Sequence, residues 1–250
     1  METHSEAQAE QPEESRPPRS SGLLATAVDI FASPGEAFTR IRERPSILFP
    51  LLLVLVPTTL ISIWYMQIVD YEWFIDDTLS RFGEMTEQQV EAMRAAYQNQ
   101  SPMMSTFSAI LGSVISTCIL YVIHAGYLTL VSLMTGDGYR FRHWFSLLSW
   151  TNLPMLLVAL VMAVNIALSP NGQISLYDAN ALSLASLGLQ TDTASFQFLF
   201  DMFSLPMIWA LGLLVMGYQQ WVKCGWVRAT LVVLAPYLLM IGIVAYFTLS

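Results

Sequence analysis

Long apolar stretches without charged residues recur along the chain, and shorter polar segments separate them. Because about 20 residues of helix cross a hydrocarbon layer of ~30 Å, stretches of this length predict membrane spans. Five spans are predicted, at about 48–68, 107–133, 144–168, 198–221 and 229–249. The pattern therefore predicts an all-α integral membrane protein, in which residues 47–250 form a bundle of five transmembrane helices preceded by an N-terminal amphipathic helix.

The segment before the first span divides into a polar tail and a helical region. Residues 1–21 are rich in Glu, Gln, Ser and Pro. They predict a disordered cytosolic tail, because so few apolar residues cannot offset the entropy lost on ordering. In residues 22–46 apolar positions recur at helical spacing, and Ser33 and Glu36 have the spacing of a capping box. We therefore expect one helix to end and a second to begin at Ser33.

The second of these helices is amphipathic. Its apolar face carries Ala37, Phe38 and Ile41, and the residues on or near its polar side are Arg40, Arg42 and Arg44. An apolar face beside arginines, directly before a span, is typical of a helix that lies in the headgroup layer. Residues 22–46 are thus expected to form amphipathic interfacial helices whose three arginines contact the membrane surface. The alternative is a linker helix that packs on the protein itself.

The connection between the first two predicted spans is acidic and is expected to face water. It extends from Asp70 to Gln100 and carries seven acidic residues against two arginines. Within it, Thr86 and Gln89 form a second capping-box pattern, which predicts a helix that continues to about Tyr97. This loop should therefore have structure of its own.

Composition agrees with a membrane protein and excludes several other classes. The chain is 54% hydrophobic and 12% charged, whereas soluble domains are usually about 25% charged. The net charge of −8 leaves no basic stripe, so nucleic acid is not an expected partner. Cys118 and Cys224 have no spacing that suggests a disulfide framework or a zinc site.

Positive charge is distributed unequally between the two sides of the predicted bundle. With the N-terminus inside, two basic residues lie outside, Arg81 and Arg94, and nine lie inside: Arg16, Arg19, Arg40, Arg42, Arg44, Arg140, Arg142, Lys223 and Arg228. Because cytoplasmic loops retain Lys and Arg, this bias predicts a cytoplasmic N-terminus and a periplasmic C-terminus.

The sequence presents no catalytic constellation, and we expect neither enzymatic activity, a cofactor nor a metal site. The intramembrane polar candidates are His124, Asn152 and Asn165. An ionisable residue within a span raises the hypothesis of a proton relay; the competing interpretation of His124 is a neutral imidazole that bonds a neighbouring helix. A small-solute or ion transporter, with these three residues lining a polar path near breaks at Pro154 and Pro236, is therefore the alternative function.

The order of several short motifs resembles bacterial members of the Yip-one family, the Ypt-interacting proteins that carry a Yip domain. The resemblance extends from about Phe31 to Ser250. Its segments are Phe31-Ala-Ser-Pro34-Gly-Glu-Ala-Phe38-Thr-Arg-Ile41 with Arg44-Pro45-Ser46, then Gly136-Asp-Gly138-Tyr-Arg-Phe141 with Phe145 and Leu153-Pro154, and finally Trp209 to Gly217 with Gly225 and Arg228-Ala229.

The resemblance implies a five-span membrane protein with a cytosolic N-terminus and no catalytic residue. Eukaryotic relatives reside in secretory membranes, bind lipidated Rab GTPases and help to shape or sort vesicles. We therefore expect a non-enzymatic, multi-pass protein of the bacterial inner membrane that acts through protein or lipid contacts in membrane organisation or trafficking. Its expected partners are membrane lipids, other membrane proteins or a second copy of itself.

Overall fold

The computed structural model describes residues 22–81, 85–99, 101–169 and 171–249. The tail predicted at 1–21 lies outside the described residues. Regular structure in the described part is helical, and an isolated β-bridge joins Ser183 to Ser204. The predicted all-α class is confirmed.

The chain order of the helices is the following. They are α1 (Leu23–Ala32), α2 (Pro34–Glu43), α3 (Leu48–Ile68), α4 (Tyr71–Ser80), α5 (Glu87–Gln98), α6 (Pro102–Thr135), α7 (Phe141–Thr151), α8 (Met155–Leu168), α9 (Leu176–Ala179), α10 (Ala194–Met202), α11 (Leu205–Val222) and α12 (Trp226–Leu249).

The two predicted capping boxes have different outcomes. At the start of α5, Thr86 and Gln89 form the reciprocal pair of hydrogen bonds that the sequence predicts. At the start of α2, Ser33 makes no side-chain cap, so that prediction is wrong. Ser33 is also the last residue of the α1 turn, where its backbone N–H donates to the carbonyl of Asp29. Ser33 therefore forms the turn between α1 and α2 through its backbone, and its side chain does not cap α2.

Four segments of the described chain are helical, long and apolar enough to cross a membrane. They are Leu48–Ile68, Met103–Thr135, Phe141–Leu168, which joins α7 and α8, and Trp226–Thr248.

The span predicted at 198–221 is not a continuous helix. Helix α10 ends at Met202, and α11 begins at Leu205 after Ser204 in extended conformation. Pro206 lies in the first turn of α11, where its missing N–H costs no hydrogen bond, so it favours a new helix at this point. With 18 residues, α11 is ~27 Å long at 1.5 Å per residue.

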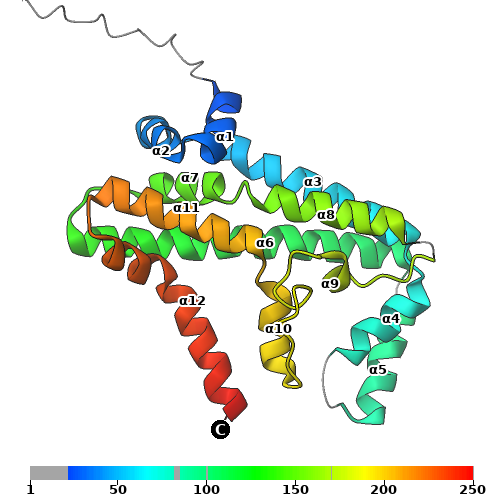
Figure 1. The fold of residues 1–250 in the computed structure, drawn as a ribbon. Coiled ribbons are helices and arrows are strands. Elements are labelled where there is room, and N and C mark those ends of the chain that lie inside the picture. The colour runs from blue at the N-terminus through cyan, green and yellow to red at the C-terminus, as the bar shows by residue number, and fades with distance from the viewer. Residues whose placement is uncertain (1–21, 82–84, 100, 170, 250) are drawn as a thin grey trace, which may run out of the picture.

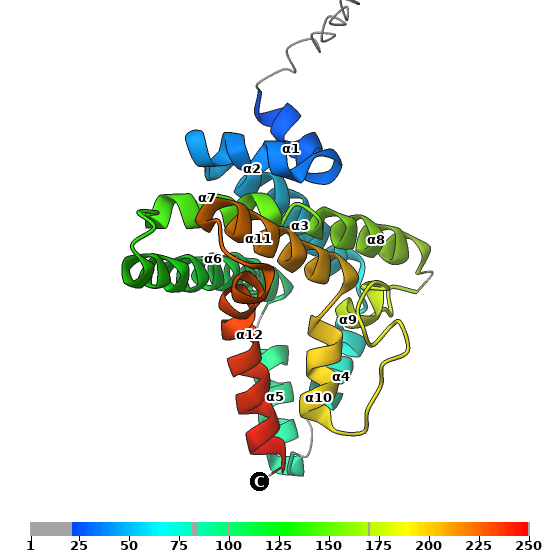
Figure 2. The ribbon, with the colours of Figure 1, turned by 60° about the vertical axis from the view of Figure 1, so that its left-hand side comes forward.

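The helices are arranged in layers that both views show. Helices α1 and α2 form the uppermost layer and lie on α7 and α11, while α6 runs beneath α7 (Figure 1). Helix α3 packs beside α8 and α6. Helices α4, α5 and α10 extend to the side opposite α1 and α2, an order that is the same after the rotation in Figure 2.

The core centres on α7. All of its residues from Trp144 to Thr151 are buried, because α2, α3, α6 and α11 cover it. The rings of Trp144 and Tyr218 stack with their centroids 5.3 Å apart. Helix α11 approaches α7 closely at Gly217, where a Cβ atom would lie 2.7 Å from Leu147 Cδ1. The absence of a side chain at Gly217 thus sets the spacing of these two helices.

Helix α12 contacts α11, α10 and α6, and its fully buried residues lie in its first half. Its fully buried residues, among those described, are Ala229 and Val233. Pro236 cannot donate a backbone hydrogen bond to the carbonyl of Val232, four residues earlier. The hydroxyl of Tyr127, on α6, donates to that carbonyl at 3.0 Å instead. A side chain of one helix therefore satisfies the polar group that the proline of another leaves open.

We predict that Gly217→Val destabilises the protein by about 1–3 kcal/mol, because the added methyl groups would overlap Leu147 in a packed core. The measurement is the thermal unfolding midpoint of the purified protein in detergent. The matched control is Gly212→Val on the same helix, since a Cβ at Gly212 meets no atom within 4 Å. Equal shifts for the two variants would contradict the role of Gly217 in α7–α11 packing.

Candidate functional site

The apolar face of α2 packs on the protein. Ala37, Phe38 and Ile41 are between 0% and 2% exposed, and α2 contacts α7 and α11. The apolar face of α2 therefore packs on the protein, as the alternative interpretation of the sequence predicts. The prediction that this face contacts lipid is wrong. The sequence did not distinguish the two, because an apolar stripe has the same spacing whether protein or lipid covers it.

Indole N–H groups fix this arrangement. Trp221 Nε1 donates to the carbonyl of Phe38 at 3.0 Å, and Trp150 Nε1 donates to the carbonyl of Ser46 at 3.1 Å. The Ser146 hydroxyl donates to the same Ser46 carbonyl at 2.9 Å. Trp150 and Trp221 are buried, and a buried indole N–H needs such an acceptor. The segment from α2 to the start of α3 is thus held by directional bonds as well as by apolar packing.

The outward face of α1 is apolar and exposed. Leu24 is 72% exposed and Val28 is 65% exposed, whereas Thr26 and Ile30 on the opposite side are buried. Leu48, at the start of α3, is 71% exposed. An uncovered apolar face therefore lies on the helix pair that precedes the first span.

The three predicted surface arginines have different surroundings. Arg40 forms an ion pair with Asp29 of α1. Among the described residues, neither Arg42 nor Arg44 has an ion-pair partner. Arg142, from the start of α7, donates to the carbonyl of Pro45 at 3.1 Å. The structure thus brings basic residues of α2 and of the α6–α7 connection to one region of the surface, which we call the basic region.

Helices α4, α5 and α9 carry acidic residues in their sequences, and these helices lie away from α1 and α2 (Figure 1). Arg81 pairs with Asp77 at 3.1 Å and with Asp178 at 3.5 Å, and Arg94 pairs with Asp76. Successive long helices therefore connect a basic region to an acidic one.

Asp70 marks the point where α3 reaches the acidic region. Its carboxylate accepts hydrogen bonds from Gln173 Nε2 at 3.1 Å and from the backbone N–H of Trp73 at 3.2 Å. These hydrogen bonds, that of Gln173 first, lower the pKa of Asp70. The bond to Gln173 ties the end of α3 to the segment that follows α8.

The structure does not bring the three intramembrane polar candidates together. His124 is 6% exposed, and its Nδ1 lies 3.4 Å from the hydroxyl of Tyr237 on α12. Asn152 Nδ2 donates to the carbonyl of Leu148 in its own helix at 2.8 Å. Asn165 Nδ2 donates to the carbonyl of Ala179 at 2.9 Å, beside α9. Each of the three side chains therefore has a different hydrogen-bond partner, in α12, α7 and α9 respectively.

A family model described as the Yip1 domain matches residues 28–247. The chain belongs to the Yip1 domain family. The match begins inside α1, so the Yip1 domain of this chain includes α2 as well as the long helices. No curated protein and no solved structure matches the chain.

Several residues that hold the α1–α2 segment on the bundle were not singled out in the sequence. Trp150 and Trp221 lie within predicted spans, where an indole is ordinarily interpreted as an interface anchor. Ser46 was identified only as part of a motif. A buried indole must find a hydrogen-bond acceptor, which was the one indication that these tryptophans contact another segment. The sequence does not show which carbonyl lies near them.

We predict that the double variant Trp150→Phe with Ser146→Ala destabilises the docked α1–α2 pair by about 1–3 kcal/mol, because the Ser46 carbonyl then loses both side-chain donors. Faster trypsin cleavage between Arg40 and Arg44 in detergent is the expected readout. Trp226→Phe is the matched control, because Trp226 is exposed. Unchanged cleavage in the double variant would show that these bonds do not hold the pair.

We also predict that His124→Gln changes stability by less than about 1 kcal/mol, since interhelical hydrogen bonds in membranes average ~0.6 kcal/mol. Tyr237→Phe removes the other partner of the same contact and should have a similar effect. Both variants are measured by thermal unfolding and by ion flux in proteoliposomes. A loss of pH-dependent flux in a folded His124→Gln protein would support the transporter alternative.

Proposed function

We propose that this Yip1 domain protein is a non-enzymatic, multi-pass protein of a bacterial cytoplasmic membrane that organises the membrane through lipid contacts of α1 and α2. The observation that carries the proposal is the exposed apolar face of α1, with Leu24 and Val28, next to the arginines of α2. Apolar residues beside cationic ones are the chemistry by which helices bind the interface of anionic membranes.

The magnitudes favour a local role for this contact. A basic residue near an anionic surface contributes about 1 kcal/mol. Arg42 and Arg44 would therefore add only a modest affinity, while the apolar spans hold the protein in the bilayer. On this proposal, α1 and α2 act on the lipids that surround the bundle rather than as its anchor.

The proposed orientation places the basic region in the cytoplasm and the acidic region in the periplasm. Its support is the excess of Lys and Arg in the basic region, because cytoplasmic loops retain these residues. We further propose α11 as a fifth crossing. It runs from Ser204, which pairs with Ser183, to Trp221, which contacts Phe38 of α2. The N-terminus would then be cytoplasmic and the C-terminus periplasmic.

A non-enzymatic role is supported by how the charged side chains are used. Asp29, Asp76, Asp77 and Asp178 each pair with an arginine of the same surface region. We propose membrane lipids as the first partner class, with other membrane proteins or a second copy of the chain as further partners in membrane organisation or trafficking.

The test is an environment-sensitive fluorophore on Leu24→Cys in full-length protein whose two native cysteines are replaced by serine. In vesicles that contain anionic phospholipid, we expect its emission to shift to shorter wavelength than in detergent, because α1 then lies in the interface. The shift should be smaller in purely zwitterionic vesicles, and added salt should reduce it.

The control position is Glu91→Cys on α5, which is exposed in the acidic region and should report water in every vesicle. A membrane-impermeant maleimide added to intact cells should reach Glu91→Cys and not Leu24→Cys. If the Leu24→Cys fluorophore reports water in anionic vesicles, the proposed lipid contact is wrong. If both cysteines react from outside, the orientation is wrong.

A further inference from the structure

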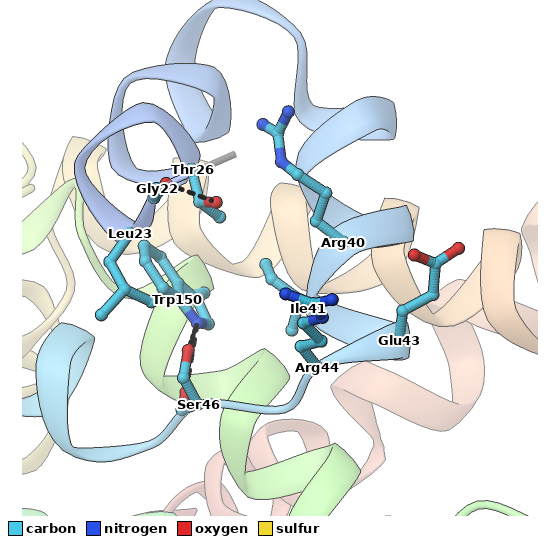
Figure 3. A pocket seen from close by; sticks show the side chains of 9 residues that line it. All are labelled: Gly22, Leu23, Thr26, Arg40, Ile41, Glu43, Arg44, Ser46 and Trp150. Atoms are coloured by element: carbon cyan, nitrogen blue, oxygen red, sulfur yellow. Dashed lines mark hydrogen bonds between the residues drawn. The ribbon is translucent and has the colours of Figure 1, made fainter. Parts of the chain in front are cut away.

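A cavity of about 490 Å³ lies between α1, α2 and the end of α7. Figure 3 shows its lining, with α1 and Trp150 on one side and α2 on the other. The residues that line it are Gly22, Leu23, Thr26, Arg40, Ile41, Glu43, Arg44, Ser46 and Trp150. Its volume is within the range of small-molecule sites, and its lining combines an aromatic ring, aliphatic groups and two guanidinium groups.

The arginines of this cavity have unused capacity to donate hydrogen bonds. Arg40 pairs with Asp29 through NH2, but its buried Nε has no partner in the part of the chain that the structure describes. Arg44 is exposed and has no ion pair there. Glu43 also lines the cavity, and in Figure 3 its carboxylate points away from Trp150. Arg44 is therefore the guanidinium of the lining that no carboxylate of the described residues pairs with.

The cavity lies beside the start of α3, which is long and apolar enough to cross a membrane. It contains Ser46, two residues before α3 begins at Leu48, whose side chain is 71% exposed. The exposed Leu24 of α1 follows Leu23, which also lines the cavity. A charged group bound here would thus lie beside the first apolar residues of a span.

We propose that this cavity binds the phosphate group of one membrane phospholipid, with Arg44 as its principal ligand and its acyl chains beside Leu48. The inference rests on the proposed lipid contact of α1 and α2 and gives it a defined site. Guanidinium groups suit this chemistry, because their planar donors match phosphate oxygens in pairs. Arg42 lies on the same helix but does not line the cavity, so the site differs from a general attraction to negative surfaces.

The experiment measures the thermal stability of full-length protein in a non-ionic detergent while dioctanoyl phosphatidylglycerol is added. A ligand that binds the folded state raises the unfolding midpoint, and the titration gives an apparent dissociation constant. We expect saturable stabilisation of the wild type. Arg44→Gln should weaken the apparent affinity about tenfold, which corresponds to ~1.4 kcal/mol. Arg42→Gln, the matched control, should change it by less than about twofold, which is under ~0.5 kcal/mol.

Two further ligands identify the source of the phosphate. Dioctanoylglycerol has the acyl chains without phosphate and should not stabilise the protein, while inorganic phosphate should bind far more weakly than the lipid. Arg44→Lys, which retains the charge, should bind the lipid more tightly than Arg44→Gln. The unfolding midpoint of each variant without lipid confirms that it is folded.

The outcomes separate this site from the proposed function. Equal weakening by Arg42→Gln and Arg44→Gln, with the Leu24→Cys fluorophore still in the interface, would overturn the cavity site and leave the surface contact intact. Binding of dioctanoylglycerol as tight as that of the phospholipid would overturn the phosphate chemistry. Inorganic phosphate that binds as well as the lipid would overturn the lipid source.

Discussion

The buried indole N–H groups that face the α1–α2 segment are the constraint on which the rest of the structure depends. A donor removed from water must find an acceptor, and here Trp150 of α7 donates to the carbonyl of Ser46 and Trp221 of α11 donates to that of Phe38. These bonds, together with the apolar face of α2, cover α7, so that a helix with serines and threonines can be buried throughout. Once α7 is covered, the positions of α6, α3 and α11 around it follow from packing.

The same requirement explains how this membrane protein tolerates its polar side chains. Trp144 Nε1 donates to Ser132 Oγ at 2.8 Å, and Tyr139 donates to the carbonyl of Trp221 at 3.0 Å. Asn165 donates in the same way to the carbonyl of Ala179, the last residue of α9. Polar groups near the spans therefore form hydrogen bonds that connect one element to another. Their presence in an apolar sequence is not by itself a sign of a transport path.

Sequence reasoning predicted much of the fold because charge limits the spans sharply. The first span, 48–68, coincides with α3, since Arg44 and Asp70 bound an uncharged run. The prediction of one continuous span at 198–221 was wrong, because hydropathy does not show where a new helix begins inside an apolar stretch. Pro206 was the local signal for the new helix. At the candidate site, the arginines and the amphipathic pattern were found from spacing. The partner of the apolar face and the cavity beside Trp150 were not, since both depend on contacts between segments that lie 104 to 183 residues apart in the sequence.

The bond from Tyr127 to the carbonyl before Pro236 divides α12 into two mechanical parts. The first half is fastened to α6 and α11, and the second half, from which Leu239 and Phe247 project into the surroundings, is joined to it at a point where one backbone hydrogen bond is missing. A helix bends more easily where one of its internal hydrogen bonds is missing. The direction of the distal half of α12 therefore depends on the bond from Tyr127 and on the contacts of α12 with α10.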